Sequence, residues 1–410
     1  MERLWLVLAA TLIAAPAFAQ VDQARAADYF NEAAALCAKD NGTLWGISLC
    51  GPIAIFDAAT KTLATNQPAP EVPRPPALGF ANAAMNWGGV RWTTIVWQMI
   101  PAAPEPRARL LVHELFHRVQ PQLGLLLNDG PNDHLDTLDG RYWLQLEWRA
   151  LASALRNTGD ARASAVRDAL AFRRERRSRV PGAAESEHVI EVNEGLAQYT
   201  GTVIAFAGDA ARIDAIAQLD EAPKNPSFVR TFAYPLGAAY GVLLEAAAPG
   251  WPRRFKATDD FGALLAVALK VAPADDSAAA ANRYGGSTLR AAEQKRDDLQ
   301  RQKIADLRRR FVDGPVLILP FASGATFTNA GMTPIPGAGT IYSSYRLTGP
   351  WGSLDAALAL IASDRTTITV PAPAKTSSPT ITGEGWTLTL APGWTLAPGA
   401  RPGDYRVVKN

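Results

Sequence analysis

The stretch RLLVHELFHRVQ, residues 109–120, decides how the rest of the chain is interpreted. It contains no Gly or Pro, and its apolar residues recur at helical spacing, which predicts a helix with one apolar face. The apolar positions are Leu110, Leu111, Leu115, Phe116 and Val119. Residues four apart lie on one helix face, so His113 and His117 can direct their imidazoles at one point. Glu114 lies at the edge of that face.

The spacing H-E-x-x-H is the arrangement in which two histidines bind zinc and the glutamate acts on a water beside the metal. The alternative is a buried helix whose histidines are hydrogen-bonded core residues. The chain has only four histidines in 410 residues, so a chance pairing at this spacing is rare. The pattern therefore favours a zinc site at His113 and His117, with Glu114 close to the metal but not bound to it.

The N-terminus, residues 1–19, predicts an export signal. It carries Arg3, then an apolar run, and ends in the small-x-small sequence Ala17-Phe18-Ala19. These are the features of a secretory signal peptide, so we expect the mature chain to begin at Gln20. No other stretch has the long uncharged apolar run of a membrane span. The sequence predicts a secreted or periplasmic protein with no membrane span.

The two cysteines are consistent with a secreted or periplasmic location. Cys37 and Cys50 are close in sequence, and an even number of cysteines in an exported chain predicts a disulfide. The alternative is two free buried thiols. A zinc site made by these cysteines is disfavoured, because their spacing is wrong and no histidine is near in sequence.

The charge of the chain gives no reason to expect a nucleic-acid partner. It contains 41 basic and 39 acidic residues, for a formal net charge of +2. The one strongly basic run, FRRERRSR at residues 172–179, is interpreted as a solvated helix face. A peptide or protein substrate, and no nucleic acid, is the expected partner of the zinc site.

Sequence patterns divide the chain into parts and predict an α+β fold. Residues 20–105 combine a short helix with strand-like runs, and residues 106–312 have mostly helical patterns. From residue 313 to 410 the pattern changes to β-branched and aromatic runs separated by Gly and Pro, which predicts a C-terminal all-β module. Within it, GWTLTLAPGWTL near residues 385–396 predicts a hairpin. The charged stretch 287–311 predicts one long helix.

A catalytic zinc ion usually has three protein ligands and an open fourth position. Besides the two histidines, the chain offers a small set of third ligands. The candidates are His134, His188, Glu147, Glu191 and Glu194. Both Glu147 and Glu194 are expected on helices that could pass the metal, and Gly195, which lacks a side chain, is expected to let the helix of Glu194 approach the histidine helix closely.

Three motifs together resemble the gluzincin metallopeptidases, most closely their aminopeptidase-like branch. The motifs are HELFH, VNEGLAQYTG and FAYPLGAAYG, and they span residues 109–241, about a third of the chain. The resemblance implies a zincin-like mixed sheet with helices over residues 20–312. It also implies that Glu194 is the third zinc ligand and that Tyr234 stabilises the oxyanion, with Tyr240 a weaker alternative.

One position departs from the resembled family. Where thermolysin-type members carry a carboxylate that supports a zinc histidine, one turn after the third ligand, this chain has Gln198. We therefore expect another group to orient the histidine. The candidates are Glu147, Glu191 and an aspartate of the stretch NDHLDTLD at 132–139, part of the loop at 129–139. The aspartates of this loop lack calcium-loop spacing, so the loop, which contains His134, is interpreted as a hydrogen-bonded structure rather than a second metal site.

The sequence thus predicts an exported zinc metallopeptidase. Zinc held by His113, His117 and Glu194 would activate a water, and Glu114 would take its proton as general base. The strand-like run at 89–100 is expected to be an exposed sheet edge that pairs with an extended peptide. The alternative is a non-catalytic binding protein, in which zinc stabilises the helices and the β-module recognises a ligand.

Overall fold

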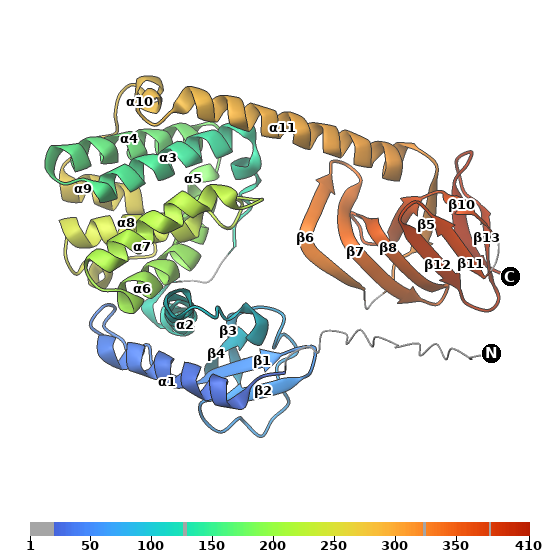
Figure 1. Cartoon of the computed structure of the whole chain (residues 1–410), viewed down its shortest axis with the longest axis horizontal. Helices are drawn as coiled ribbons and strands as arrows, with labels where there is room; N and C mark the ends of the chain where they lie inside the picture. The colour runs from blue at the N-terminus through green and yellow to red at the C-terminus, as the bar shows by residue number, and fades with distance from the viewer. Residues whose placement is uncertain (1–19, 126–128, 323–324, 377–378) are drawn as a thin grey trace, which may run out of the picture. The chain divides into compact units, whose positions relative to one another are not determined.

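The computed structural model describes residues 20–125, 129–322, 325–376 and 379–410, so the expected signal peptide lies outside the described residues. The chain divides into two compact units, residues 1–293 and 294–410 (Figure 1). The first unit combines a small sheet with most of the helices, and the second is dominated by strands. The predicted α+β class with a C-terminal all-β module is confirmed.

Eleven α-helices lie in the described residues. They are α1 (Gln23–Asp40), α2 (Pro104–Val119), α3 (Leu138–Arg156), α4 (Gly159–Ser178), α5 (Ala183–Ile190), α6 (Leu196–Ala205), α7 (Asp209–Glu221), α8 (Ala233–Ala247), α9 (Phe261–Leu269), α10 (Ser277–Arg283) and α11 (Gly286–Arg308). A π-helical turn, Glu191–Gly195, joins α5 to α6. The long helix predicted at 287–311 is confirmed as α11 and the π-helical turn that follows it, Arg309–Asp313.

A four-stranded sheet packs against α1 and α2 in the first unit (Figure 1). Its strands are β1 (Ile53–Asp57), β2 (Thr62–Thr65), β3 (Ala83–Trp87) and β4 (Val90–Val96). They lie in the order β2-β1-β4-β3, with β1 and β4 parallel and the other pairs antiparallel. The prediction that β4 is a sheet edge is wrong, because β3 pairs with its outer side. The edge strand on that side is β3.

Helix α2 contains nearly all of the stretch 109–120. Pro104 lies in its first turn, where the missing N–H costs no hydrogen bond. Most apolar residues of the stretch then face the core with almost no exposed surface. The buried ones are Leu111, Val112, Leu115, Phe116 and Val119. This burial fixes the rotation of α2 and therefore the direction in which both histidines point.

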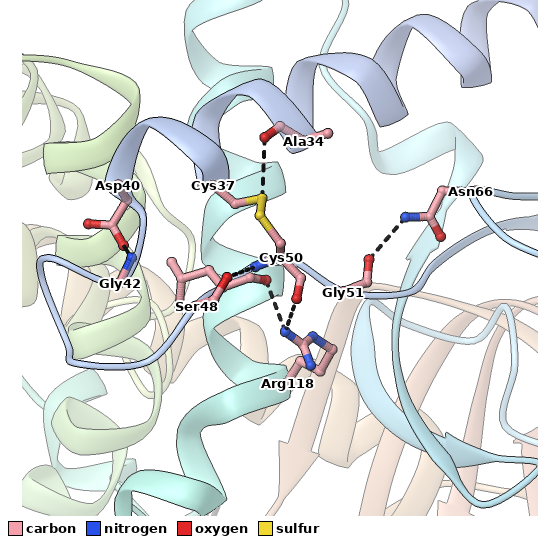
Figure 2. Close-up of a disulfide and its surroundings, with 10 residues drawn as sticks. Ala34, Cys37, Asp40, Gly42, Ser48, Cys50, Gly51, Asn66 and Arg118 are labelled. Atoms are coloured by element: carbon pink, nitrogen blue, oxygen red, sulfur yellow. Dashed lines mark hydrogen bonds between the residues drawn. A yellow bond between two sulfur atoms is a disulfide. The ribbon is translucent and has the colours of Figure 1, made fainter.

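The disulfide predicted between Cys37 and Cys50 is present, with 5.3 Å between the two Cα atoms. It ties the end of α1 to the segment that leads into β1 (Figure 2). Arg118, the residue after His117, donates from Nη2 to the carbonyl oxygens of Leu49 and Cys50, at 3.0 and 2.7 Å. The cross-linked segment is therefore joined directly to the histidine helix.

The second unit has its own strands and its own core. The strands are β5 (Val316–Pro320), β6 (Thr326–Ile335), β7 (Gly339–Gly349), β8 (Gly352–Ala362), β9 (Thr367–Pro371), β10 (Pro373–Lys375), β11 (Thr380–Gly383), β12 (Trp386–Leu390), β13 (Trp394–Pro398) and β14 (Tyr405–Lys409). Alternate residues of β12 are buried, as expected for a strand with one covered face. The hairpin predicted at GWTLTLAPGWTL is wrong, because β12 pairs with β11 and β8 while β13 pairs with β14.

Across the described parts of the chain, no helix is both long enough and apolar enough to cross a bilayer.

Candidate metal centre

Two helices of the first unit bring three donor atoms together. His113 Nε2 and His117 Nε2 from α2 are 3.0 Å apart. Glu194 Oε2, from the π-helical turn Glu191–Gly195, is 3.3 Å from His113 Nε2 and 3.4 Å from His117 Nε2. All three side chains are buried. The three residues form a group that can hold a metal ion.

The size of this triangle fits zinc. A tetrahedral zinc ion with bonds of 2.0–2.1 Å has ligand atoms about 3.3–3.4 Å apart. Two of the three donor–donor distances have this value, and the third is slightly shorter. Two imidazoles and one carboxylate are also a common ligand set for zinc with one open position.

Glycines set the spacing of the helices that carry these donors. A Cβ atom at Gly201 of α6 would lie 2.6 Å from the carbonyl oxygen of Arg109, so Gly201 permits the close contact of α6 with α2. The expectation that Gly195 has this role is wrong. Gly195 instead faces α8, where a Cβ atom on Gly237 would collide with the Gly195 backbone.

Two glutamines hold the histidine rings. His113 Nδ1 lies 3.1 Å from Gln198 Oε1, and His117 Nδ1 lies 2.8 Å from Gln120 Oε1. An amide oxygen accepts from Nδ1–H, so in the neutral imidazole the proton is on Nδ1 and Nε2 can bind a metal. The expectation that a carboxylate replaces Gln198 in this role is wrong, because Gln198 performs it. Gln120 was missed, although its position three residues after His117 was a signal.

Both glutamines are themselves fixed by the protein. Gln120 Nε2 donates to the carbonyl oxygens of Val192 and Asn193, at 2.8 and 3.0 Å, in the turn that carries Glu194. Gln198 Nε2 donates to Gln218 Oε1 at 2.7 Å. Gln120 therefore both orients His117 and connects the end of α2 to the turn that carries the third donor.

Glu114 is buried beside the three donors. Its Oε2 atom has no hydrogen-bond partner among the described residues. Burial, which disfavours the charged form, raises the pKa of this carboxyl above its ordinary value, and the neighbouring histidines only partly offset the effect. A buried carboxylate oxygen with no protein partner is suited to accept a proton from a bound molecule.

Tyr234 lies against the metal centre and Tyr240 does not. The Tyr234 ring stacks on the His113 ring, with 5.5 Å between centroids and 4° between planes. Burial and the negative charge of Glu194 raise its pKa, so its hydroxyl is a stable proton donor. Tyr240 OH instead donates to Glu147 Oε1 at 2.7 Å, in the core. The structure therefore places only the first of the two candidate tyrosines at the donors.

The donors open onto a hollow of about 470 Å³. Glu114, Tyr234, Arg109 and Arg230 are among its lining residues. Arg230 Nη2 lies 3.3 Å from Glu194 Oε1, and its Nη1 pairs with Asp129. Sequence reasoning missed Arg230, although its position four residues before Tyr234 placed it close to an expected site residue.

The other carboxylates considered as ligands belong to a separate cluster. Glu147 pairs with Arg173 and Arg176, and Glu191 pairs with Arg173 and Arg177. The prediction that residues 172–179 form a solvated face is therefore wrong for Arg173 and Arg176, which are buried. Among the candidates considered, the structure brings Glu194 to the histidines and keeps Glu147 in the core.

The two remaining histidines are also engaged elsewhere. His134 Nε2 lies 2.9 Å from Glu187 Oε1, and His188 Nε2 lies 2.7 Å from the carbonyl oxygen of Ala257. His188 falls in a second group of potential metal ligands with Glu191 and Asp260. Each of those carboxylates, however, pairs with two arginines, Arg173 and Arg177, and both of its oxygens already accept hydrogen bonds, which leaves none free for a cation.

No protein-family model matches the chain, and no match was found among curated proteins or solved structures. The geometry of the three donors and their surroundings therefore carries the functional argument.

Proposed function

We propose that the protein is a zinc-dependent peptidase. The observation that carries this proposal is the triangle of His113 Nε2, His117 Nε2 and Glu194 Oε2, with the unpartnered Oε2 of Glu114 beside it. A purely structural zinc ion would need no buried carboxylate without a partner. Glu114 therefore favours catalysis over the alternative of a zinc-stabilised binding protein.

Three side chains would hold the metal, and two others would act on the substrate. When bound, zinc supplies a Lewis acid that activates water and polarises a peptide carbonyl. Glu114 accepts the proton of the attacking water and returns it to the leaving amine, since it is the one carboxylate in the described lining of the hollow that is not used as a ligand. The Tyr234 hydroxyl donates a hydrogen bond to the developing oxyanion.

The small sheet offers a docking edge for an extended peptide. β3 is the edge strand next to α2, and Ala81 and Asn82, which lead into it, line the same hollow as the donors. An extended peptide can pair with the free side of such a strand. The proposal therefore moves the substrate-binding edge from β4 to β3.

The disulfide supports the proposal that the protein is exported, because disulfides persist in oxidising compartments. Mass spectrometry of the protein recovered from the periplasm or medium should give a mature chain that starts at Gln20. An intact N-terminus at Met1 in a cytoplasmic fraction would contradict export.

The direct test compares the wild type with Glu114→Gln. The variant should keep its zinc, because Glu114 is not a ligand, and should lose peptide hydrolysis by roughly 10²–10⁴-fold. Zinc is measured by atomic emission, and hydrolysis with a quenched-fluorescence peptide library. Glu105→Gln, on an exposed position of the same helix, is the matched control and should behave like the wild type. Equal cleavage by Glu114→Gln and the wild type would reject the proposal.

A further inference from the structure

The hollow at the metal centre presents two cations and no unused carboxylate in its described lining. Its basic side chains, apart from the histidines, are Arg109 and Arg230, and its acidic ones are Glu114 and Glu194. Glu194 is a metal ligand and Glu114 is the general base under the proposed function. An amino terminus would therefore find no free acidic partner there, whereas a carboxylate would find a guanidinium.

Arg230 is the better placed of the two cations. Its side chain is 50% exposed, against 21% for Arg109, which is held by Asp214. Asp129 and Glu194 fix the Arg230 guanidinium from two sides but use only part of its five N–H donors. The remaining donors are fixed in direction by these contacts, which lowers the entropy cost of binding a further carboxylate.

The distance to the metal centre limits where that carboxylate can be in a substrate. Arg230 Nη2 lies 3.3 Å from Glu194 Oε1, and the other oxygen of the same carboxylate is a metal donor. One residue of an extended peptide spans about 3.3–3.6 Å. A carboxylate one or two residues from the scissile bond can therefore contact Arg230 while the reacting carbonyl is at the donors.

We infer that Arg230 selects peptide substrates that carry a carboxylate within two residues of the scissile bond. The carboxylate is either the free C-terminus or an Asp or Glu side chain. This inference rests on the proposed peptidase function and adds the class of substrate. Arg230 contacts the substrate in this role and does not take part in the proton transfers.

The test uses matched peptides that differ only in this charge. One pair has a free or an amidated C-terminus, and a second, amidated pair has Glu or Gln next to the cleaved bond. We expect the wild type to prefer the charged member of at least one pair by about 10-fold or more in kcat/KM, as for a charge-assisted hydrogen bond. The pair that shows the preference identifies the source of the carboxylate.

Arg230→Gln should remove the preference, and Arg230→Lys should restore part of it. Arg156→Gln is the matched control, because Arg156 is also half exposed, at 49%, and pairs with an aspartate, Asp220, that does not line the hollow. This control should keep the wild-type preference. Zinc content should be unchanged in all three variants.

Binding gives a second readout that does not depend on turnover. Calorimetry with zinc-loaded Glu114→Gln should show tighter binding of the charged peptide, and adding Arg230→Gln should abolish the difference. Equal kcat/KM for both members of each pair in the wild type would overturn the inference and leave the peptidase proposal intact. Loss of zinc from Arg230→Gln would also overturn it, by making Arg230 a support for Glu194. No hydrolysis of any peptide by the zinc-loaded wild type would reject the peptidase function itself.

Discussion

The first unit contains two clusters of buried carboxylates that differ in their partners. Glu194 lies between two imidazoles, and its Oε2 faces both of them. Glu147 lies between two guanidinium groups and a tyrosine hydroxyl, so both of its oxygens are occupied. In the first cluster Arg230 pairs only with Oε1 of Glu194, so lone pairs of Oε2 remain available for a cation, whereas both oxygens of Glu147 already accept hydrogen bonds. Burial alone therefore does not identify a metal ligand. The side chains that contact the carboxylate, imidazoles or guanidinium groups, distinguish the two cases.

The largest expected effect is on zinc affinity, and it tests the cluster around Glu194. Glu194→Ala should weaken zinc binding by ~10³-fold or more, because only two protein ligands remain. Zinc affinity is measured by competition with a chromogenic chelator. Glu147→Ala is the comparison and should retain its zinc at chelator concentrations that strip Glu194→Ala. The reverse order would place the third ligand at Glu147.

The next largest expected effect is on the free energy of unfolding, and it tests the cluster around Glu147. Glu147→Ala should lower the free energy of unfolding by about 3–5 kcal/mol, because it removes one partner from the buried cation of Arg176. Urea unfolding followed by the helical circular-dichroism signal measures it. Glu194→Ala, compared with the metal-free wild type, should lose much less. Equal losses would show that the two carboxylates do not have separate roles.

A smaller effect is expected from the residues that orient the histidines. Gln198→Leu and Gln120→Leu should each reduce zinc affinity by about 10–100-fold, since Nδ1 of the corresponding histidine loses its acceptor. Isothermal titration of zinc into the apoprotein measures the change. Gln294→Leu, on an exposed position of α11, is a control and should bind zinc like the wild type. Wild-type zinc affinity in both variants would mean that these hydrogen bonds do not affect zinc binding.

The last expected effect concerns the slope of stability against pH in acid, and it tests the cluster around Arg176. Burial disfavours the charged form of Glu187, but Arg176 outweighs it and holds the pKa of this carboxyl well below its ordinary 4.5. A lowered pKa in the folded state stabilises the fold above pH 4.5, and this stabilisation is lost as the pH falls from 4.5 toward the lowered value. Glu187→Gln should therefore flatten the acid side of the stability–pH curve. An unchanged slope in this variant would exclude Glu187 as the titrating group.

The sequence was sufficient for the class of fold and for two of the three donors of the candidate metal centre. Helical periodicity alone aligns His113 with His117, because four residues make about one turn. Glu194 came from a resemblance rather than from spacing, since 194 − 117 = 77 residues separate it from His117. Nothing in the local sequence distinguishes the surroundings of Glu147 and Glu194, because the arginines that neutralise Glu147 come from α4.

The predictions that proved wrong concern features that depend on contacts between segments far apart in the sequence. Charge favours water, which is why the sequence predicts a solvated face at 172–179, but carboxylates from three other segments compensate the burial of Arg173. The edge position of β4 was wrong because strand order depends on pairing, which composition does not encode. Gln198 and Arg230 act through atoms that meet only after the helices pack.

The π-helical turn Glu191–Gly195 changes the rotation per residue inside an otherwise continuous helix. In an α-helix each residue advances by about 100°, so residues 191 and 194 would return to within about 60° of one another. The wider turn, with hydrogen bonds to the fifth residue, advances each position by less and keeps Glu191 and Glu194 further apart around the axis. One helix can thus present one glutamate to the arginines of the core and another to the histidines of α2. Deleting a single residue from this turn would restore the α-helical repeat, and one of the two glutamates would then lose its partner.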